Sequence, residues 1–152
     1  MKGTKKVETK RITLENDLSA AFHIRKKVFV EEQGVPLEDE FDEFDTLDGQ
    51  CRHILAYYDE KPVGTGRIRV VDNLGKLERI CILEPYRQFG LGRVIIQALE
   101  GIAEELGVSQ VKLHGQTQAE GFYQKLGYQA SSNIFMEDGI PHILMEKQLT
   151  TN

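Results

Sequence analysis

Residues 87–93 have the composition of a phosphate-binding loop. They follow an apolar run at 77–83 and open an amphipathic helical pattern that continues to Leu106. The first backbone amides of a helix have no partner within it, and the aligned peptide dipoles make that end partly positive, so an anion can bind there. Two glycines let the backbone turn tightly and approach a ligand closely. The loop, which we expect to hold a pyrophosphate, consists of Arg87, Gln88, Phe89, Gly90, Leu91, Gly92 and Arg93.

Two common phosphate-binding loops do not fit this segment. A dinucleotide loop needs a glycine or alanine where Ile95 stands, and a nucleoside triphosphate loop needs a Gly-Lys-Ser/Thr ending, which is absent. The order Arg87-x-x-Gly90-x-Gly92 instead resembles the signature of the GCN5-related N-acetyltransferases, whose loop wraps the pyrophosphate of coenzyme A. The resemblance implies that acetyl-coenzyme A is the cosubstrate.

A second stretch, one helix and one strand later, resembles the same family. By this resemblance, Gln116 bonds the pantetheine through its amide, and Arg93 and Lys125 lie near phosphate charge. Segments around Arg25, Asp45 and His142 also resemble a bacterial, ElaA-like branch of the family. The second stretch, which has glutamine and tyrosine where the family has asparagine and phenylalanine, reads Gln116-x-x-Ala119-x-x-Phe122-Tyr123-x-Lys125-x-Gly127-Tyr128.

Acetyl transfer from a thioester to an amine sets three chemical requirements. The amine must be neutral, the oxyanion of the tetrahedral intermediate must be stabilised, and the departing thiolate needs a proton. The resemblance implies that the strand before the loop splays from its neighbour. Backbone groups of Ile80, Cys81 and Ile82 would then meet the pantetheine and the thioester carbonyl.

Tyr123 is the candidate proton donor, because it matches a tyrosine that lies near the coenzyme A sulfur in many relatives. A phenol with a pKa of about 10 stays protonated at neutral pH and can protonate the thiolate. The alternative is a core aromatic on a half-buried helix that also carries Phe122 and Leu126. We favour the catalytic role.

Glu78 and His142 are the candidate bases. An alkyl amine with a pKa of about 10.4 is mostly ammonium at neutral pH, so a group must accept its proton. Glu78 lies on the strand before the loop and, by period-two alternation, shares a face with Ile80 and Ile82. His142 follows an Ile-Pro turn, and imidazole changes charge near neutral pH. A surface carboxylate and a hydrogen-bonded histidine at a sheet edge remain the alternatives.

The charge of the chain is unevenly distributed. The formal net charge is -5, and residues 38–48 hold seven acids and no base, so the remainder carries 19 basic and 17 acidic residues. No extended basic face is indicated, which argues against nucleic-acid binding. The acidic segment either attracts a cationic amine through its field or, as we favour, is a solvated loop that Phe41 and Phe44 anchor.

Length and composition, with 40% hydrophobic residues, indicate a single domain over residues 1–152, and the resemblance implies that it is an N-acetyltransferase domain. Cys51 and Cys81 are far apart and are interpreted as reduced core thiols, and the four histidines lack ligand spacing, so we expect no metal. Residues 1–6 are charged, and no apolar run is long enough to span a membrane. We expect a cytoplasmic protein without membrane association.

The first half of the chain predicts a helix followed by three strands. Apolar spacing indicates a helix over 16–33, with Asn16 or Asp17 as its cap and Gly34 at its end. Three extended runs then follow with short connections, which indicates an antiparallel meander. These runs cover residues 52–58, 63–71 and 76–83.

The second half alternates helices and strands. The helix that begins at the loop ends at Gly107, and a strand follows at 111–114. Thr117 and Glu120 form a predicted capping box for a helix to Leu126, and Asp138-Gly139 predicts a final hairpin between 133–137 and 142–149. The order β-α-βββ-α-β-α-ββ defines an α/β (α+β) fold with a mixed, mostly antiparallel sheet and helices on both faces.

Two rival functions remain open. Acyl-homoserine lactone synthases have a related fold and a similar first helix, but they lack the Arg-x-x-Gly-x-Gly loop. A non-catalytic module that senses coenzyme A is the other rival, and the presence of Tyr123 argues against it. The acceptor is expected to be a small-molecule or peptide amine, and a homodimer through the final hairpin is plausible.

Overall fold

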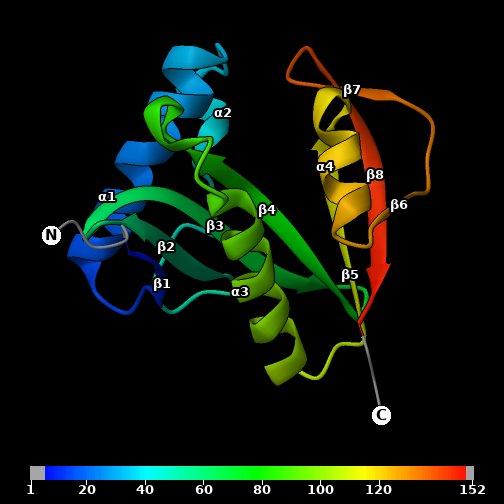
Figure 1. Ribbon diagram of the computed structural model, residues 1–152, viewed down its shortest axis with the longest axis horizontal. Helices are drawn as coiled ribbons and strands as arrows, with labels where there is room; N and C mark the ends of the chain where they lie inside the picture. The colour runs from blue at the N-terminus through cyan, green and yellow to red at the C-terminus, as the bar shows by residue number, and fades with distance from the viewer. Residues whose placement is uncertain (1–5, 150–152) are drawn as a thin grey trace, which may run out of the picture.

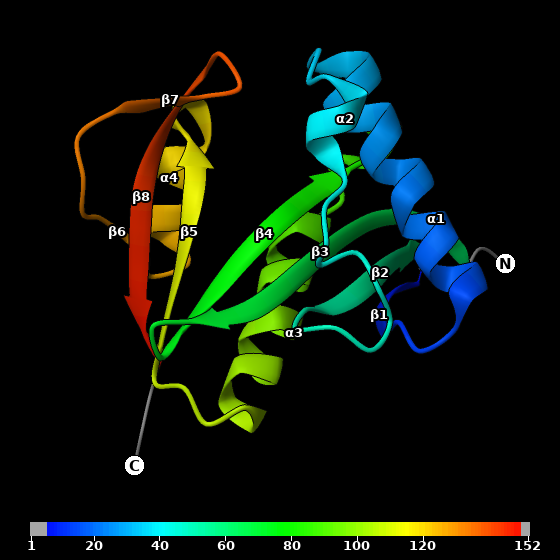
Figure 2. The ribbon, with the colours of Figure 1, turned by 180° about the vertical axis from the view of Figure 1, so that it is seen from behind.

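The computed structural model describes residues 6–149, which form one eight-stranded sheet with helices on both faces (Figures 1 and 2). This confirms the expected fold class. The strands are β1 (Val7–Arg11), β2 (Arg52–Tyr58), β3 (Lys61–Val71), β4 (Leu74–Ile82), β5 (Gln110–Gln116), β6 (Gln129–Ala130), β7 (Phe135–Glu137) and β8 (Ile140–Gln148). The helices are α1 (Glu15–Arg25), η1 (Lys26–Glu32), α2 (Leu37–Glu40), η2 (Glu84–Tyr86), α3 (Leu91–Glu105), η3 (Thr117–Ala119) and α4 (Glu120–Lys125).

The sheet opens between β4 and β5. These two strands pair in parallel over three residue pairs only, from Gly75↔Val111 to Leu77↔Leu113. Figures 1 and 2 show the two strands meeting near the end of β8 and then diverging as a V. The expected splay before the loop is therefore present. Beyond Leu77, the edge of β4 that faces β5 has no strand partner among residues 6–149.

Two apolar clusters flank the sheet. The larger lies between the strands and α3, whose predicted apolar face is buried at Ile95, Leu99 and Ile102. The smaller lies under α1 on the opposite face. As expected, α3 ends before Gly107, which adopts a left-handed conformation with a φ of 82°.

The helix boundaries depart from the predictions in two places. The first helix starts after Leu14, without the predicted Asn16 or Asp17 cap, and continues as the π-helix η1 to Glu32. The predicted capping box is also wrong, because Thr117 begins the 3-10 turn η3 and makes no capping hydrogen bond. A side chain that matches a capping pattern accepts a hydrogen bond from the first turn of the helix only when its residue occupies the N-cap position with a non-helical backbone.

A β-bulge in β4 changes which way Glu78 points. Thr65 and Arg67 of β3 pair with Cys81 and Glu78, so β4 has one extra residue there, and Arg79 has a φ of 58°. Glu78 consequently contacts Arg67 on the α1 face, whereas Ile80 packs with the α3 cluster. The prediction that Glu78 shares a face with Ile80 and Ile82 is wrong, because alternation fails across a bulge.

The final hairpin forms as predicted. Asp138 and Gly139 have φ values of 52° and 75° and connect β7 to β8, as expected for a two-residue hairpin turn. The short strand β6 pairs with β8 and was not predicted. Between residues 6 and 149 no helix is long and apolar enough to cross a membrane.

Candidate active site

The opening between β4 and β5 contains a cavity of about 370 Å³. All three predicted catalytic residues line it, although they come from β4, α4 and β8. Five of the predicted cofactor residues line it as well. The predicted residues that the cavity brings together are Tyr123, Glu78, His142, Ile80, Cys81, Ile82, Arg87 and Gln116.

The other predicted cofactor residues lie outside this cavity. Arg93 and Lys125 both line a second cavity of about 530 Å³ between α3 and α4. Gly90 is the N-cap of α3, with a φ of 76°, and an added Cβ there would meet nothing within 4 Å. Phe89 stacks on Tyr58, with ring centroids 4.4 Å apart. The surroundings of the loop are therefore open at Gly90, where the unpaired first amides of α3 begin.

Two predicted cofactor side chains are hydrogen-bonded within the protein. Arg87 donates through Nε to the carbonyl of Ile82 (2.9 Å) and through both terminal nitrogens to Glu32. Gln116 donates through Nε2 to Gln33 (3.0 Å) and accepts from Gln118 (2.7 Å). Their side chains join the loop and β5 to the end of the first helix.

Tyr123 lies in an aromatic cluster on α4. An added Cβ on Gly115 would come within 3.0 Å of the Tyr123 ring, so the glycine permits this close packing against β5. Burial raises the pKa of Tyr123 to about 12, which keeps the phenol protonated at neutral pH. Tyr123 is half-buried and also lines the cavity, so its role in packing is compatible with a role as proton donor.

Glu78 is held by three cations. Its carboxylate contacts Arg67 (3.0 Å), Arg69 (3.1 Å) and Lys76 (3.0 Å). Burial alone would raise the pKa of Glu78, but hydrogen bonds from Arg69 and Lys76 and the charge of Arg67 outweigh it and lower the pKa to about 2. A carboxylate held in this way is a weak proton acceptor near neutral pH.

His142 has one ring nitrogen engaged and one available. Nδ1 lies 2.7 Å from the carbonyl of Ile140, which can only accept, so Nδ1 carries the proton. In the neutral ring Nε2 then holds the lone pair, and Oε2 of Glu137 lies 4.0 Å from it. The second carboxylate oxygen of Glu137 accepts from Nδ1 of His114 (2.8 Å).

Glu137 and His114 were not singled out from the sequence. The sequence did contain a signal for Glu137. Glu137 and Ile140 flank the predicted Asp138-Gly139 turn, and Ile140 stands two residues before His142. Strand β5 supplies His114 two residues before Gln116, on the same face.

The candidate acid and base lie on opposite faces of the sheet. Tyr123 packs against Gly115, whereas the neighbouring Gln116 points to the other face and is the cross-strand partner of His142. Gln116 also bonds Gln33 at the end of η1, so His142 shares the α1 face. The opening in the sheet joins the two faces.

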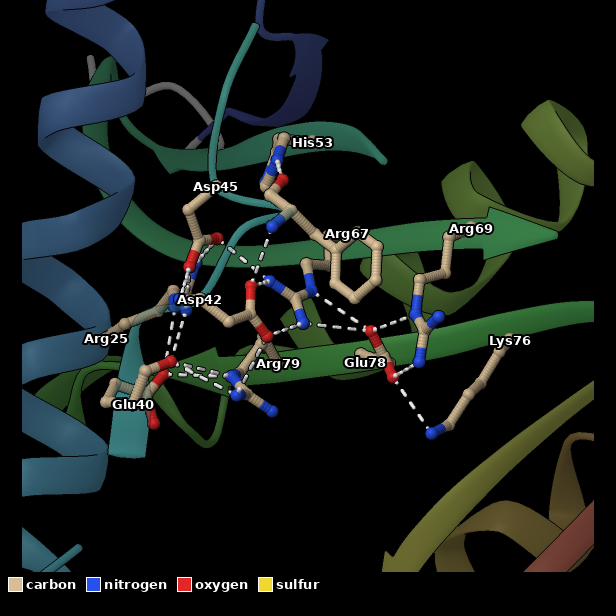
Figure 3. Close-up of polar contacts among 11 residues, drawn as sticks. Arg25, Glu40, Asp42, Asp45, His53, Arg67, Arg69, Lys76, Glu78 and Arg79 are labelled. Carbon is tan, nitrogen blue, oxygen red and sulfur yellow. Dashed lines mark hydrogen bonds and ion pairs between the residues drawn. The ribbon is translucent and has the colours of Figure 1, made fainter. Parts of the chain in front are cut away.

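The acidic segment 38–48 is paired rather than solvated at three of its seven acids (Figure 3). Glu40 pairs with Arg25 (2.9 Å), Asp42 with Arg67 (2.9 Å), and Asp45 contacts both arginines. Both arginine side chains are about 1–2% exposed. The prediction of a solvated loop is therefore wrong for these acids, because it could not anticipate buried cations from α1 and β3.

The predicted aromatic anchors of this segment are confirmed. Phe41 packs edge-on against Phe22, with centroids 5.1 Å apart, and the Arg25 guanidinium lies over its ring. Phe44 lies under Arg69 at 4.3 Å. We define the ionic network as Arg25, Glu40, Asp42, Asp45, Arg67, Arg69, Lys76, Glu78 and Arg79. The network forms one wall of the cavity through Glu40, Glu78 and Arg79.

The cysteines are free and buried, as expected. Burial raises the pKa of the Cys51 thiol to about 11 and that of Cys81 further still. Neither thiol is therefore activated as a nucleophile. Within residues 6–149, no cluster of histidine, cysteine and acidic side chains is arranged to hold a metal ion.

Comparisons with known proteins agree with this architecture. A Bacillus subtilis protein provisionally named as an acetyltransferase is 66% identical over 93% of this chain and 97% of its own length. A crystal structure of an N-acetyltransferase from Lactobacillus plantarum superposes with a TM-score of 0.84 at 32% identity, covering 97% of this chain and 100% of the other. Escherichia coli ElaA is 31% identical over 88% of this chain and 89% of its own length, and its crystal structure gives a TM-score of 0.82.

The family model described as "Acetyltransferase (GNAT) domain" matches residues 19–149. The names of the relatives do not favour a lactone synthase or a non-catalytic sensor. The chain belongs to the GNAT acetyltransferases, enzymes that transfer an acyl group to an amine.

Proposed function

We propose that this protein transfers an acetyl group from acetyl-coenzyme A directly to a primary amine, with Tyr123 as acid and His142 as base. One observation carries the proposal. A single cavity joins a protonated phenol on one face of the sheet to an imidazole with an available Nε2 on the other. Cosubstrate and acceptor would therefore approach from opposite faces and meet in the opening.

The loop and the free edge of β4 fit the cosubstrate. The amides of Leu91, Gly92 and Arg93 would bind the pyrophosphate, with Gln88 to Gly90 completing the turn. Backbone groups of residues 80–82 that face away from β3 would bond the pantetheine and the thioester carbonyl. The Thermoplasma acidophilum PaiA N-acetyltransferase, which shares this fold with a TM-score of 0.69 at 16% identity, was crystallised with coenzyme A, which supports coenzyme A as a ligand of this fold.

The chemistry follows from the two candidate groups. Nε2 of His142 accepts a proton from the ammonium, and the neutral amine attacks the thioester carbonyl. The attacking nitrogen becomes cationic and releases a second proton to solvent. As the carbon–sulfur bond breaks, Tyr123 donates its phenolic proton to the sulfur. Glu78 is assigned a positioning role within the ionic network, because its pKa of about 2 makes it a poorer base than the imidazole.

Binding and turnover test this function separately. Calorimetry with coenzyme A and acetyl-coenzyme A measures binding, and thiol release with a panel of amines measures transfer. Micromolar binding together with release that depends on an amine is the expected result. Tight binding without release on any amine would favour a sensor, and release only with acyl-carrier substrates and S-adenosylmethionine would favour a lactone synthase.

A valine at Gly90 is expected to weaken coenzyme A binding about tenfold or more. A β-branched residue at a φ of 76° is strained, so the loop would change conformation and displace the α3 amides. Gly107→Val is the matched control, because Gly107 has a φ of 82° and equally open surroundings at the other end of α3. Calorimetry that shows equal affinities for the two variants would remove the loop from the cosubstrate site.

Three further expectations remain proposals. A homodimer through the final hairpin is supported by Ile134 and Met136, which are both 64% exposed there. Sedimentation at several concentrations tests it. A role for Gln116 in pantetheine binding requires that its amide exchange Gln33 for the ligand. The cytoplasmic location remains a prediction from the sequence.

A further inference from the structure

We propose that Glu137 is a positioning residue that, held by His114, orients His142 and stabilises the imidazolium that forms during acetyl transfer. This inference rests on the proposed function and deepens it. It assigns roles to two residues of β5 and β7 that lie at the cavity opposite the cosubstrate loop.

The Glu137 carboxylate lies between the two imidazoles. Oε1 accepts from Nδ1 of His114 at 2.8 Å, and Oε2 lies 4.0 Å from Nε2 of His142. The hydrogen bond from His114 and its charge lower the pKa of Glu137, so the carboxylate is ionised when a proton reaches His142. Because the hydrogen bond from His114 fixes Oε1 of Glu137, Oε2 stays directed at the His142 ring.

Packing restricts both rings. Phe135 is the cross-strand partner of His142, and the two rings stack with centroids 6.1 Å apart. The same phenylalanine meets His114 edge-on at 5.1 Å. The His142 side chain is 9% exposed, and Nδ1 is tied to the carbonyl just before Pro141. The ring therefore has one orientation, in which Nε2 and not Nδ1 receives a proton.

The proton account closes around these groups. The ammonium loses a proton to Nε2, and the resulting imidazolium gains an ion pair with Oε2 of Glu137. The amine nitrogen bonds to the thioester carbon and becomes cationic, and it then releases a second proton to solvent. The carbon–sulfur bond breaks, and the thiolate takes the proton of Tyr123. The tyrosinate is reprotonated through solvent at the expense of the imidazolium. No oxidant, reductant or further co-reactant is needed.

Other charged or titratable groups surround the cavity and contribute to its field. Those that line it are Glu40 from α2, Glu78, Arg79 and Cys81 from β4, Arg87 from the loop, Tyr123 from α4 and Asp138 from the hairpin turn, and the charge of Lys76 also acts on Glu137. Glu78 and Glu40 are paired within the ionic network, and Lys76 contacts Glu78. Glu137 is the acid for which the structure gives a contact with His142.

Glu137→Gln tests the proposal because it keeps the shape and removes the charge. We expect kcat to fall about tenfold and the acid limb of the kcat profile to move about one pH unit lower, since the imidazolium loses its counter-ion. Glu146→Gln on β8 removes the same charge outside the cavity and should leave both unchanged. His114→Phe, which keeps an aromatic ring against Phe135, should move the limb in the same direction by a smaller amount.

An NMR titration of isotope-labelled histidine provides a readout that does not need turnover. The His142 titration midpoint should fall in Glu137→Gln, and Nδ1 should carry the proton in the neutral ring. An unchanged midpoint in both Glu137→Gln and His114→Phe would overturn the inference, whatever the activity. Wild-type protein that binds coenzyme A but transfers to no amine would instead overturn the proposed function.

Discussion

Tyr123→Phe is expected to lower kcat about 10²- to 10³-fold while leaving coenzyme A affinity within about twofold, because general acid catalysis contributes about 10²- to 10⁴-fold. The variant retains the ring that fills the space beside Gly115 and loses only the proton that the thiolate needs. Because burial raises the pKa of Tyr123 to about 12, the phenol is protonated and can act as a donor at neutral pH. Thiol release with saturating amine measures kcat, and calorimetry measures affinity.

Tyr128→Phe is the matched control for this experiment. Its hydroxyl donates to Glu100 at 2.7 Å, and its ring meets Tyr123 with centroids 6.0 Å apart. Loss of this buried hydrogen bond should cost about 1 kcal/mol of stability without changing kcat. If Tyr123→Phe turned over as fast as wild type with chemistry rate-limiting, another group would have to protonate the thiolate.

Arg67→Met is expected to lower the free energy of unfolding by about 3–5 kcal/mol. The side chain is 2% exposed and contacts Asp42, Asp45 and Glu78. Removal of one partner from a buried ion pair leaves charge without compensation, and methionine restores only the packing. Denaturant unfolding measures the difference. Arg11→Met is the control, because its ion pair with Glu105 is solvent-exposed and should contribute at most about 1 kcal/mol.

Arg67→Met should also make the free energy of unfolding less dependent on pH in the acid range. Hydrogen bonds and charge from Arg67 outweigh burial and hold the pKa of Asp42 below its usual range, and the pKa of Glu78 is about 2. Their contribution is complete above the unfolded values near 4 and is lost as the pH falls toward 2. The gap between wild type and Arg67→Met should therefore narrow on acidification from pH 7 to pH 3. A gap of constant size would show that packing and not charge accounts for the loss.

Local patterns predicted the elements and the loop of this protein well. The Asp138-Gly139 turn, the αL glycine after α3 and the α3 apolar face follow from backbone preferences and periodicity. The family motifs brought together residues 80–82, Gln116 and Tyr123, which line one cavity. Such features depend on neighbours in sequence, so the sequence carries them directly.

Features that depend on distant segments were missed. The bulge at Arg79 reverses the direction of Glu78, and nothing in a continuous strand pattern indicates an extra residue. The acidic segment 38–48 forms ion pairs with Arg25 and Arg67, which lie outside it on other elements of the fold. His114 and Glu137 meet only after β5, β7 and β8 assemble. Charge pairing across a fold requires the register of the strands, which single-sequence patterns do not give.

The short seam between β4 and β5 means that the protein is two half-sheets joined by three residue pairs, with the Gln33–Gln116 amide pair spanning the gap. A pantetheine arm lying along the edge of β4 would take the place of a strand and connect the two half-sheets. The cosubstrate would then be a structural component as well as a reactant. The free energy of unfolding would rise with the cosubstrate concentration, by about 2.7 kcal/mol when that concentration is a hundredfold above Kd.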